Sequence, residues 1–199
     1  TLQFHNIDLM KLVEQYGTPL KFTYLPAISN NINKAKGWFR KGMEKIGYEG
    51  KYYYCYCTKS SHFKFIMNEA FKNNIHIETS SAYDINIVEK LMAEGKINKN
   101  TYVVCNGFKR DEYVTNIARL MNNGHNKTIP VIDNYEELDL LQEQIKGKFK
   151  IGIRIAAEEE PKFEFYTSRL GIRAKDILEF YVDNIEGNED RFQLKMLHI

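Results

Sequence analysis

Short apolar segments alternate with helical patterns along most of this 199-residue chain. Strands are expected over residues Lys51–Thr58, Ile75–Thr79, Thr101–Cys105, Thr128–Ile132, Phe149–Ile155 and Phe192–Ile199. A pattern with apolar residues at helical spacing follows each of the first five, so the strands recur about every 25 residues with one longer gap. This alternation predicts an α/β protein with a parallel sheet and its helices outside.

The number of expected strands leaves two architectures open. Six strands are visible, whereas a closed (β/α)8 TIM-type barrel has eight. The sheet is therefore either open and doubly wound, or about six of the eight strands of a barrel. The last strand runs to Ile199 without a turn or a helix cap, which favours the barrel. We expect a lead-in of helices and an extended run in residues 1–45 and the first part of the barrel in residues 46–199.

Composition excludes several classes of function. A formal net charge of +2 gives no electrostatic reason to expect nucleic-acid binding. No apolar run approaches the ~18 residues of a membrane span. Three cysteines cannot all pair with one another, and Cys55 and Cys57 fall in an expected core strand, so we expect reduced, buried thiols in a cytoplasmic protein. A metal site at Cys-x-Cys lacks further ligands at suitable spacing, so none is expected.

The first expected strand ends in a lysine. Aromatic residues and cysteines lead into Lys59, and two serines and a helical pattern follow it. At the carboxyl end of a parallel strand this amine would face the edge where such folds keep their active sites. It is either a strand-end lysine that reaches water, or a Schiff-base lysine made nucleophilic by desolvation.

Several motifs resemble one enzyme family. The sequence Tyr56-Cys57-Thr58-Lys59-Ser60-Ser61 is similar to the Tyr-Ala-Val-Lys-Ala-Asn motif of the alanine-racemase-like decarboxylases. Further matching segments follow in the family's order across the chain: Gly17–Leu20, Ile77–Ser81, Val103–Tyr113, Ile153–Ala156, Ser168–Ile172 and Leu197–Ile199. The segment Val103–Tyr113 resembles the biosynthetic arginine decarboxylases most closely.

The resemblance implies a fold, a cofactor and a reaction. It implies a (β/α)8 barrel that binds pyridoxal 5'-phosphate, followed in the family by a C-terminal β-domain that this chain lacks. The implied activity is decarboxylation of a basic amino acid, with L-arginine converted to agmatine for polyamine synthesis as first choice. It also implies a homodimer, with Arg169 reaching the partner subunit. The phosphate-binding loop and a catalytic cysteine belong to later parts of such proteins, so this fragment alone is expected to be inactive.

The same resemblance assigns four site residues. Lys59 would hold pyridoxal phosphate as a Schiff base, and Glu78 would lie beside the cofactor. Arg154 resembles the family's buried arginine in the same network. His198 resembles the histidine whose imidazole stacks on the pyridine ring.

Structural explanations exist for each of these residues. His198 is alternatively a hydrogen-bonded core histidine, and Arg154 with Glu78 a structural ion pair.

Lys109 and Arg110 are expected to be solvated charges in a loop. Glu158-Glu159-Glu160 is expected to form an exposed acidic loop. Asn134 and Glu137 have the spacing of a capping box at the start of a helix.

Other functions remain open. The chain is alternatively part of a diaminopimelate or ornithine decarboxylase. It also fits a non-catalytic pyridoxal-phosphate-binding homologue on the same barrel, or a regulatory homologue that no longer binds the cofactor. The sequence Cys105-Asn106-Gly107-Phe108-Lys109-Arg110 is the one feature that favours arginine.

Overall fold

The computed structural model describes residues 2–156 and 170–199. Its helices are α1 (Leu9–Tyr16), α2 (Leu25–Lys45), α3 (Lys64–Ala70), the short 3-10 helix η1 (Phe71–Asn73), α4 (Ala82–Ala93), α5 (Asp111–Asn122), α6 (Tyr135–Gln144) and α7 (Ala174–Asn184). Its strands are β1 (Gln3–Phe4), β2 (Ile7–Asp8), β3 (Cys55–Cys57), β4 (His76–Thr79), β5 (Val103–Cys105), β6 (Thr128–Ile132), β7 (Phe149–Arg154) and β8 (Phe192–His198).

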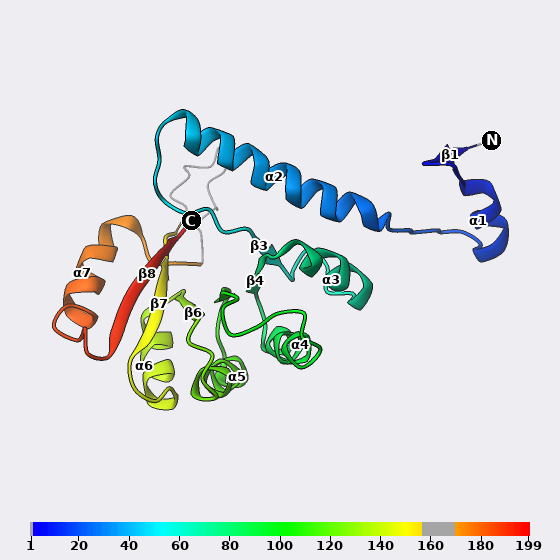
Figure 1. The fold of residues 1–199 in the computed structure, drawn as a ribbon. Coiled ribbons are helices and arrows are strands. Elements are labelled where there is room, and N and C mark those ends of the chain that lie inside the picture. Colours follow the sequence, from blue (N-terminus) through cyan, green and yellow to red (C-terminus); the bar gives the residue numbers. More distant parts are fainter. Residues whose placement is uncertain (1, 157–169) are drawn as a thin grey trace, which may run out of the picture.

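The six predicted strands form one sheet in sequence order, β3-β4-β5-β6-β7-β8. Every neighbouring pair is parallel. Helices α3 to α7 cover the outer side of the curved sheet (Figure 1). The α/β class and the order of the strands are therefore confirmed, and a doubly wound order, in which the strand sequence reverses, is excluded for these strands.

The core lies between the sheet and these helices. Ile77, Val103 and Ile151 of the strands are fully buried, as are Ile85 of α4 and Ile117 of α5. These helices therefore use the apolar face that their sequence pattern predicts. The predicted capping box is also present, because the side chain of Asn134 accepts a hydrogen bond from the backbone N–H of Glu137 at the start of α6.

The first strand of the six-stranded sheet differs from its prediction. The sequence predicts a largely buried strand over Lys51–Thr58, but β3 covers only Cys55–Cys57 and all three residues are half-buried. The physical reason is position, because β3 is an edge strand that pairs with β4 on one side only. Cys105, in the interior of the sheet, is the buried thiol, whereas Cys55 and Cys57 are partly exposed.

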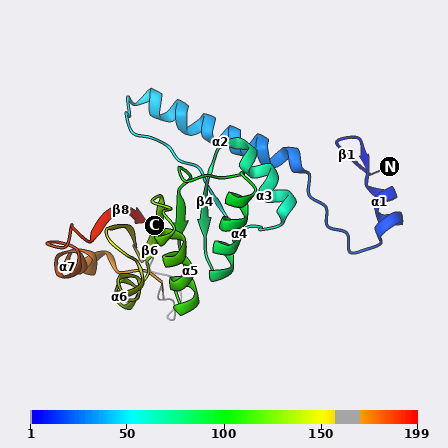
Figure 2. The same ribbon diagram turned by 60° about the horizontal axis from the view of Figure 1, so that its bottom comes forward.

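The N-terminal part stands apart from the sheet. The hairpin β1–β2 and α1 lie beyond the N-terminal end of α2 in both views (Figures 1 and 2). The segment Leu20–Tyr24, expected to be extended, carries no strand pairing. Helix α2 packs on α3 and η1 and buries Ile32, while Trp38 and Phe39 remain mostly exposed. None of the described helices has the length and apolar character needed to cross a membrane.

Candidate active site

The carboxyl ends of the parallel strands collect the polar residues of interest at one edge of the sheet. Lys59 follows β3 by two residues, Glu78 is the third residue of β4, and Asn106 comes directly after β5. Arg154 and His198 are the last residues of β7 and β8 and are register partners. The four residues assigned from the resemblance therefore lie at the same edge, together with Asn106.

Glu78, Asn106 and His198 form a hydrogen-bonded group there. The side-chain amide of Asn106 donates to Glu78 Oε1 at 3.2 Å and lies 3.3 Å from His198 Nε2. Glu78 Oε2 lies 3.8 Å from His198 Nε2, which is an ion-pair distance if the imidazole is protonated. Strands β4 and β8 are at separate positions in the sheet, so Asn106 bridges residues that strand pairing alone does not join.

This group favours the ionised form of Glu78. Its interaction with His198 is the largest cause that lowers the pKa of the carboxyl below the ordinary value of 4.5. Partial burial opposes this by raising the pKa, and the amide of Asn106 and the ammonium of Lys59 lower it further. Glu78 therefore provides a fixed negative charge close to Lys59 at neutral pH.

Two buried polar atoms in this group lack a hydrogen-bond partner among the residues that the structure describes. They are Asn106 Oδ1 and His198 Nδ1. A buried polar atom without a partner costs about 1–3 kcal/mol, so both atoms require a partner such as an ordered water or a ligand. One is an acceptor, and the other donates or accepts according to the tautomer. Together with a nearby primary amine, these atoms suit a polar cofactor that carries an aldehyde.

Asn106 was not among the residues assigned from the sequence. The signal that would have found it is the glycine after it. Gly107 has a φ of +81°, and a Cβ at this position would approach the carbonyl oxygen of Ser80 to 3.0 Å. The chain needs glycine here for the end of β5 to lie against the end of β4, where the backbone N–H of Asn106 donates to Thr79 O at 2.9 Å.

Lys59 is exposed in the structure, which corrects the expectation that the aromatic strand desolvates it. It lies in a turn that other residues hold in place. The N–H and hydroxyl of Ser60 both donate to Cys57 O, at 3.2 and 2.8 Å, and the hydroxyl of Tyr56 donates to Ser61 O at 2.9 Å. The backbone is thus ordered while the amine stays accessible to solvent and to a ligand.

Arg154 pairs with a residue that the sequence did not suggest. Its Nη1 donates to Asp133 Oδ1 at 3.1 Å, and the Asp133 side chain is 2% exposed. In place of the alternative Arg154–Glu78 ion pair, Arg154 pairs with Asp133, and Glu78 lies against His198. Asp133 follows β6, the strand beside β7, and this adjacency explains the pairing.

Lys109 is also placed differently from its prediction as a solvated charge. Its ammonium is fully buried and lies 3.0 Å from Glu137 Oε2. It also donates to Gly107 O at 2.9 Å and, by a short contact, to Val131 O. The same Glu137 carboxylate accepts from the backbone N–H of Lys109 at 2.8 Å and of Asp133 at 2.9 Å. This pair joins the loops after β5 and β6.

The remaining candidate features are the possible metal ligands, the cysteines and two segments outside the described residues. No group of three or more His, Cys, Asp or Glu suited to a metal occurs in residues 2–156 and 170–199. Burial raises the pKa of Cys55 to about 11 and that of Cys105 to about 12, so both are protonated thiols at neutral pH. Arg169 and Glu158-Glu159-Glu160 lie outside the described residues.

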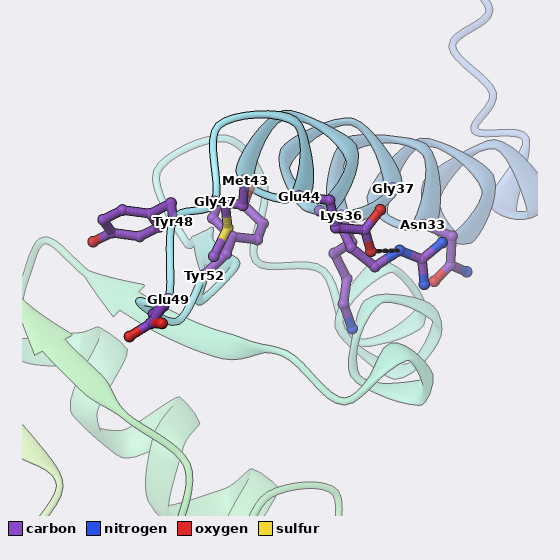
Figure 3. A pocket seen from close by; sticks show the side chains of 10 residues that line it. Asn33, Lys36, Gly37, Met43, Glu44, Gly47, Tyr48, Glu49 and Tyr52 are labelled. Carbon is purple, nitrogen blue, oxygen red and sulfur yellow. Dashed lines mark ion pairs between the residues drawn. The ribbon is translucent and has the colours of Figure 1, made fainter.

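A large cavity lies elsewhere. It measures about 840 Å³ and lies between α2 and the loop that follows it (Figure 3). Its lining mixes charges, with Lys36 and Arg40 beside Glu44 and Glu49. Arg40 Nε and Glu44 Oε1 lie 3.9 Å apart, and Lys36 donates to Asn73 O at 3.0 Å. None of the residues at the strand ends lines it, so it does not belong to the candidate site.

Comparison with known sequences finds arginine decarboxylases. No family model matches the chain. The biosynthetic arginine decarboxylase of Pasteurella multocida is 25% identical over 190 residues, which cover 90% of this chain and 29% of that protein. The arginine decarboxylase of Glycine max is 26% identical over 224 residues, covering 100% of this chain and 32% of its own length. The chain thus spans about a third of the curated relatives that it matches.

Solved structures share the fold. The biosynthetic arginine decarboxylase of Campylobacter jejuni superposes with a TM-score of 0.66 at 22% identity, over 94% of this chain and 32% of that one. A diaminopimelate decarboxylase from M. jannaschii, in complex with L-lysine, gives a TM-score of 0.74 at 20% identity, over 97% and 44% of the two chains. The chain is thus similar in sequence to arginine decarboxylases along nearly its whole length, and it shares its fold with arginine and diaminopimelate decarboxylases, as the resemblance implied.

Proposed function

We propose that this chain is the first part of a pyridoxal-phosphate-dependent decarboxylase that acts on a basic amino acid, with L-arginine as the substrate. The observation that carries the proposal is the position of Lys59, Glu78 and His198 at one edge of the sheet, although they come from distant parts of the sequence. The six parallel strands support a (β/α)8 barrel, with residues 46–199 as its first part and residues 1–45 as its lead-in.

The cofactor is proposed from the residues available to hold it. The amine of Lys59 would bond to the aldehyde carbon, and His198 would face the ring. Asn106 Oδ1 and His198 Nδ1, both buried and without a partner among the described residues, would meet polar atoms of the ligand. Bound pyridoxal phosphate supplies an electron sink for the electron pair that remains when carbon dioxide leaves.

The remaining chemistry is carried by this chain's own side chains. Glu78, whose pKa is lowered chiefly by its contact with His198, places a negative charge beside His198 and near Lys59. The amide of Asn106 limits the movement of both the carboxylate and the imidazole. Arg154, held by Asp133, places a second positive charge beside His198 on the neighbouring strand.

Similarity in sequence is the reason for proposing arginine, rather than another basic amino acid, as the substrate. Both curated relatives described above are arginine decarboxylases, whereas the solved structures include arginine and diaminopimelate decarboxylases. The intact protein is proposed to be a homodimer, because the family builds its site between two subunits.

Decarboxylation assays of the intact protein test this function. With pyridoxal phosphate present, carbon dioxide release from L-arginine should exceed release from diaminopimelate and ornithine. Lys59→Ala should lower that release by several orders of magnitude, because it removes a group that bonds covalently to the cofactor. Faster turnover of diaminopimelate than of L-arginine would make diaminopimelate the substrate instead. Normal turnover by Lys59→Ala would contradict the role of this lysine.

A further inference from the structure

A buried carboxylate contacts the residue that precedes Lys59. The turn that carries Lys59 is called the lysine turn below. Asp84, in the first turn of α4, is 7% exposed. Its Oδ2 accepts a hydrogen bond from the hydroxyl of Thr58 at 2.8 Å and one from the backbone N–H of Ser80 at 2.8 Å. The hydroxyl of Ser80 lies 3.4 Å from the same oxygen. One carboxylate oxygen therefore connects the residue before Lys59 to the end of β4.

Capping of α4 does not account for this arrangement. The N-cap residue Ser81 makes no side-chain capping hydrogen bond. The carboxylate of Asp84 instead reaches back to two neighbouring strand ends, and hydrogen bonds to an ionised acceptor are roughly twice as strong as neutral ones. Its negative charge near the helix N-terminus is also favoured by the helix dipole.

The bond restricts the backbone on which Lys59 is built. Thr58 is fully buried, whereas Lys59 beside it is exposed. The backbone N–H of Thr58 also donates to Glu78 O at 3.0 Å. Thr58 is thus fixed through both its backbone and its side chain, and the direction in which Lys59 leaves the strand is fixed with it.

We infer that Asp84 and Thr58 form a positioning pair that sets the direction of the Lys59 amine toward the proposed cofactor. This inference rests on the proposed function. Neither residue needs to contact the cofactor, because both act through the backbone of the lysine turn. The motif of the related decarboxylases has valine at the position of Thr58, so the hydroxyl that makes this bond is a feature of this chain.

The test measures cofactor affinity rather than turnover. Thr58→Val removes the hydroxyl with little change of shape, and Thr58→Ser keeps a hydroxyl. Thr128→Val is the matched control, because Thr128 is equally buried but its hydroxyl bonds to His125 Nδ1 at the opposite end of the sheet. Pyridoxal phosphate would be titrated into the cofactor-free intact protein, with Schiff-base absorbance and the melting temperature recorded for each variant.

We expect Thr58→Val to weaken pyridoxal phosphate binding by about tenfold, the scale of a lost hydrogen bond to a charged group. Thr58→Ser should bind pyridoxal phosphate as the wild type does. Thr128→Val should lower the melting temperature without weakening pyridoxal phosphate binding. Asp84→Asn, which keeps the volume but not the charge, should weaken binding in the same direction and provides the test if Thr58→Val does not fold. Wild-type affinity in Thr58→Val and Asp84→Asn, or equal weakening in Thr128→Val, would overturn the inference.

Failure of the proposed function gives a different result. If reduction with borohydride places no pyridoxyl label on Lys59 of the wild-type protein, the function and the positioning pair are both wrong. If the wild-type label is on Lys59 but Thr58→Val binds normally, the positioning pair alone is wrong.

Discussion

At the scale of single residues, the candidate site depends on one amide. The side-chain amide of Asn106 donates to Glu78 and also lies 3.3 Å from His198 Nε2, so it links a carboxylate and an imidazole that are 3.8 Å apart. A charge-assisted hydrogen bond orders both partners more strongly than a neutral bond would. The arrangement keeps Glu78 ionised and the ring of His198 close to it.

The lowered pKa of Glu78 gives a prediction about stability and pH. A carboxyl whose pKa is lower in the folded protein adds stability above its unfolded pKa, and this stability is lost as pH falls through the folded value. Glu78→Gln should therefore lower the free energy of unfolding by about 1 kcal/mol at pH 7. The difference from the wild type should shrink as the pH falls below the ordinary value of 4.5.

Urea denaturation of both proteins at several pH values measures this difference. Glu94→Gln is a useful control, because Glu94 also has a lowered pKa but its partner Lys64 is largely exposed. It should change stability much less. A constant difference between wild type and Glu78→Gln from pH 7 to pH 3 would contradict the proposed ionisation of Glu78.

At the scale of elements, a buried ion pair holds together the two segments that follow the carboxyl ends of β5 and β6. Lys109 and Glu137 belong to the loops and helices after β5 and β6, and their side chains are 0% and 2% exposed. Removal of one partner leaves a buried charge without compensation. Since Glu137 also binds the backbone N–H of Asp133, and Asp133 holds Arg154, the pair supports the candidate site indirectly.

We expect Lys109→Met to lower the free energy of unfolding by about 3–5 kcal/mol. Lys64→Met gives the matched control. The Lys64–Glu94 pair has the same 3.0 Å distance, but its side chains are 65% and 29% exposed, so its loss should cost less than about 1 kcal/mol. Chemical denaturation measures both, and equal losses in the two variants would show that burial does not determine the strength of the Lys109 pair.

The elements were more predictable than the environment of their residues. The strand β6 begins and ends where the sequence pattern places it, and the capping box of α6 is present. The burial of Lys109 was not predictable, because its partner lies 28 residues away and is brought near by sheet pairing. Asn106 was missed for the same reason, since its contacts come from β4 and β8.

At the scale of the whole molecule, the sheet has two edge strands, β3 and β8. Edge strands expose unpaired backbone groups, which proteins usually cover by pairing, by closure or by assembly. The half-burial of β3 follows from this position, and it explains why Lys59 is exposed although its strand is rich in aromatic residues. The aromatic pattern before Lys59 is typical of a strand that is covered on both sides, whereas β3 has a neighbouring strand on one side only.

The proposed homodimer is tested by sedimentation of the intact protein. If the site is shared between two subunits, as the resemblance implies, the active species should sediment as a dimer, and dilution into monomers should reduce decarboxylation. A monomer that keeps full activity at all concentrations would contradict the dimer.

The identity of the lysine that binds pyridoxal phosphate tests the central claim most directly. The intact protein, loaded with the cofactor, would be reduced with borohydride, digested and mapped by mass spectrometry. The pyridoxyl label should be on Lys59, while the buried and already paired Lys109 should carry none. A label on any other lysine, or unchanged Schiff-base absorbance in Lys59→Ala, would contradict the account.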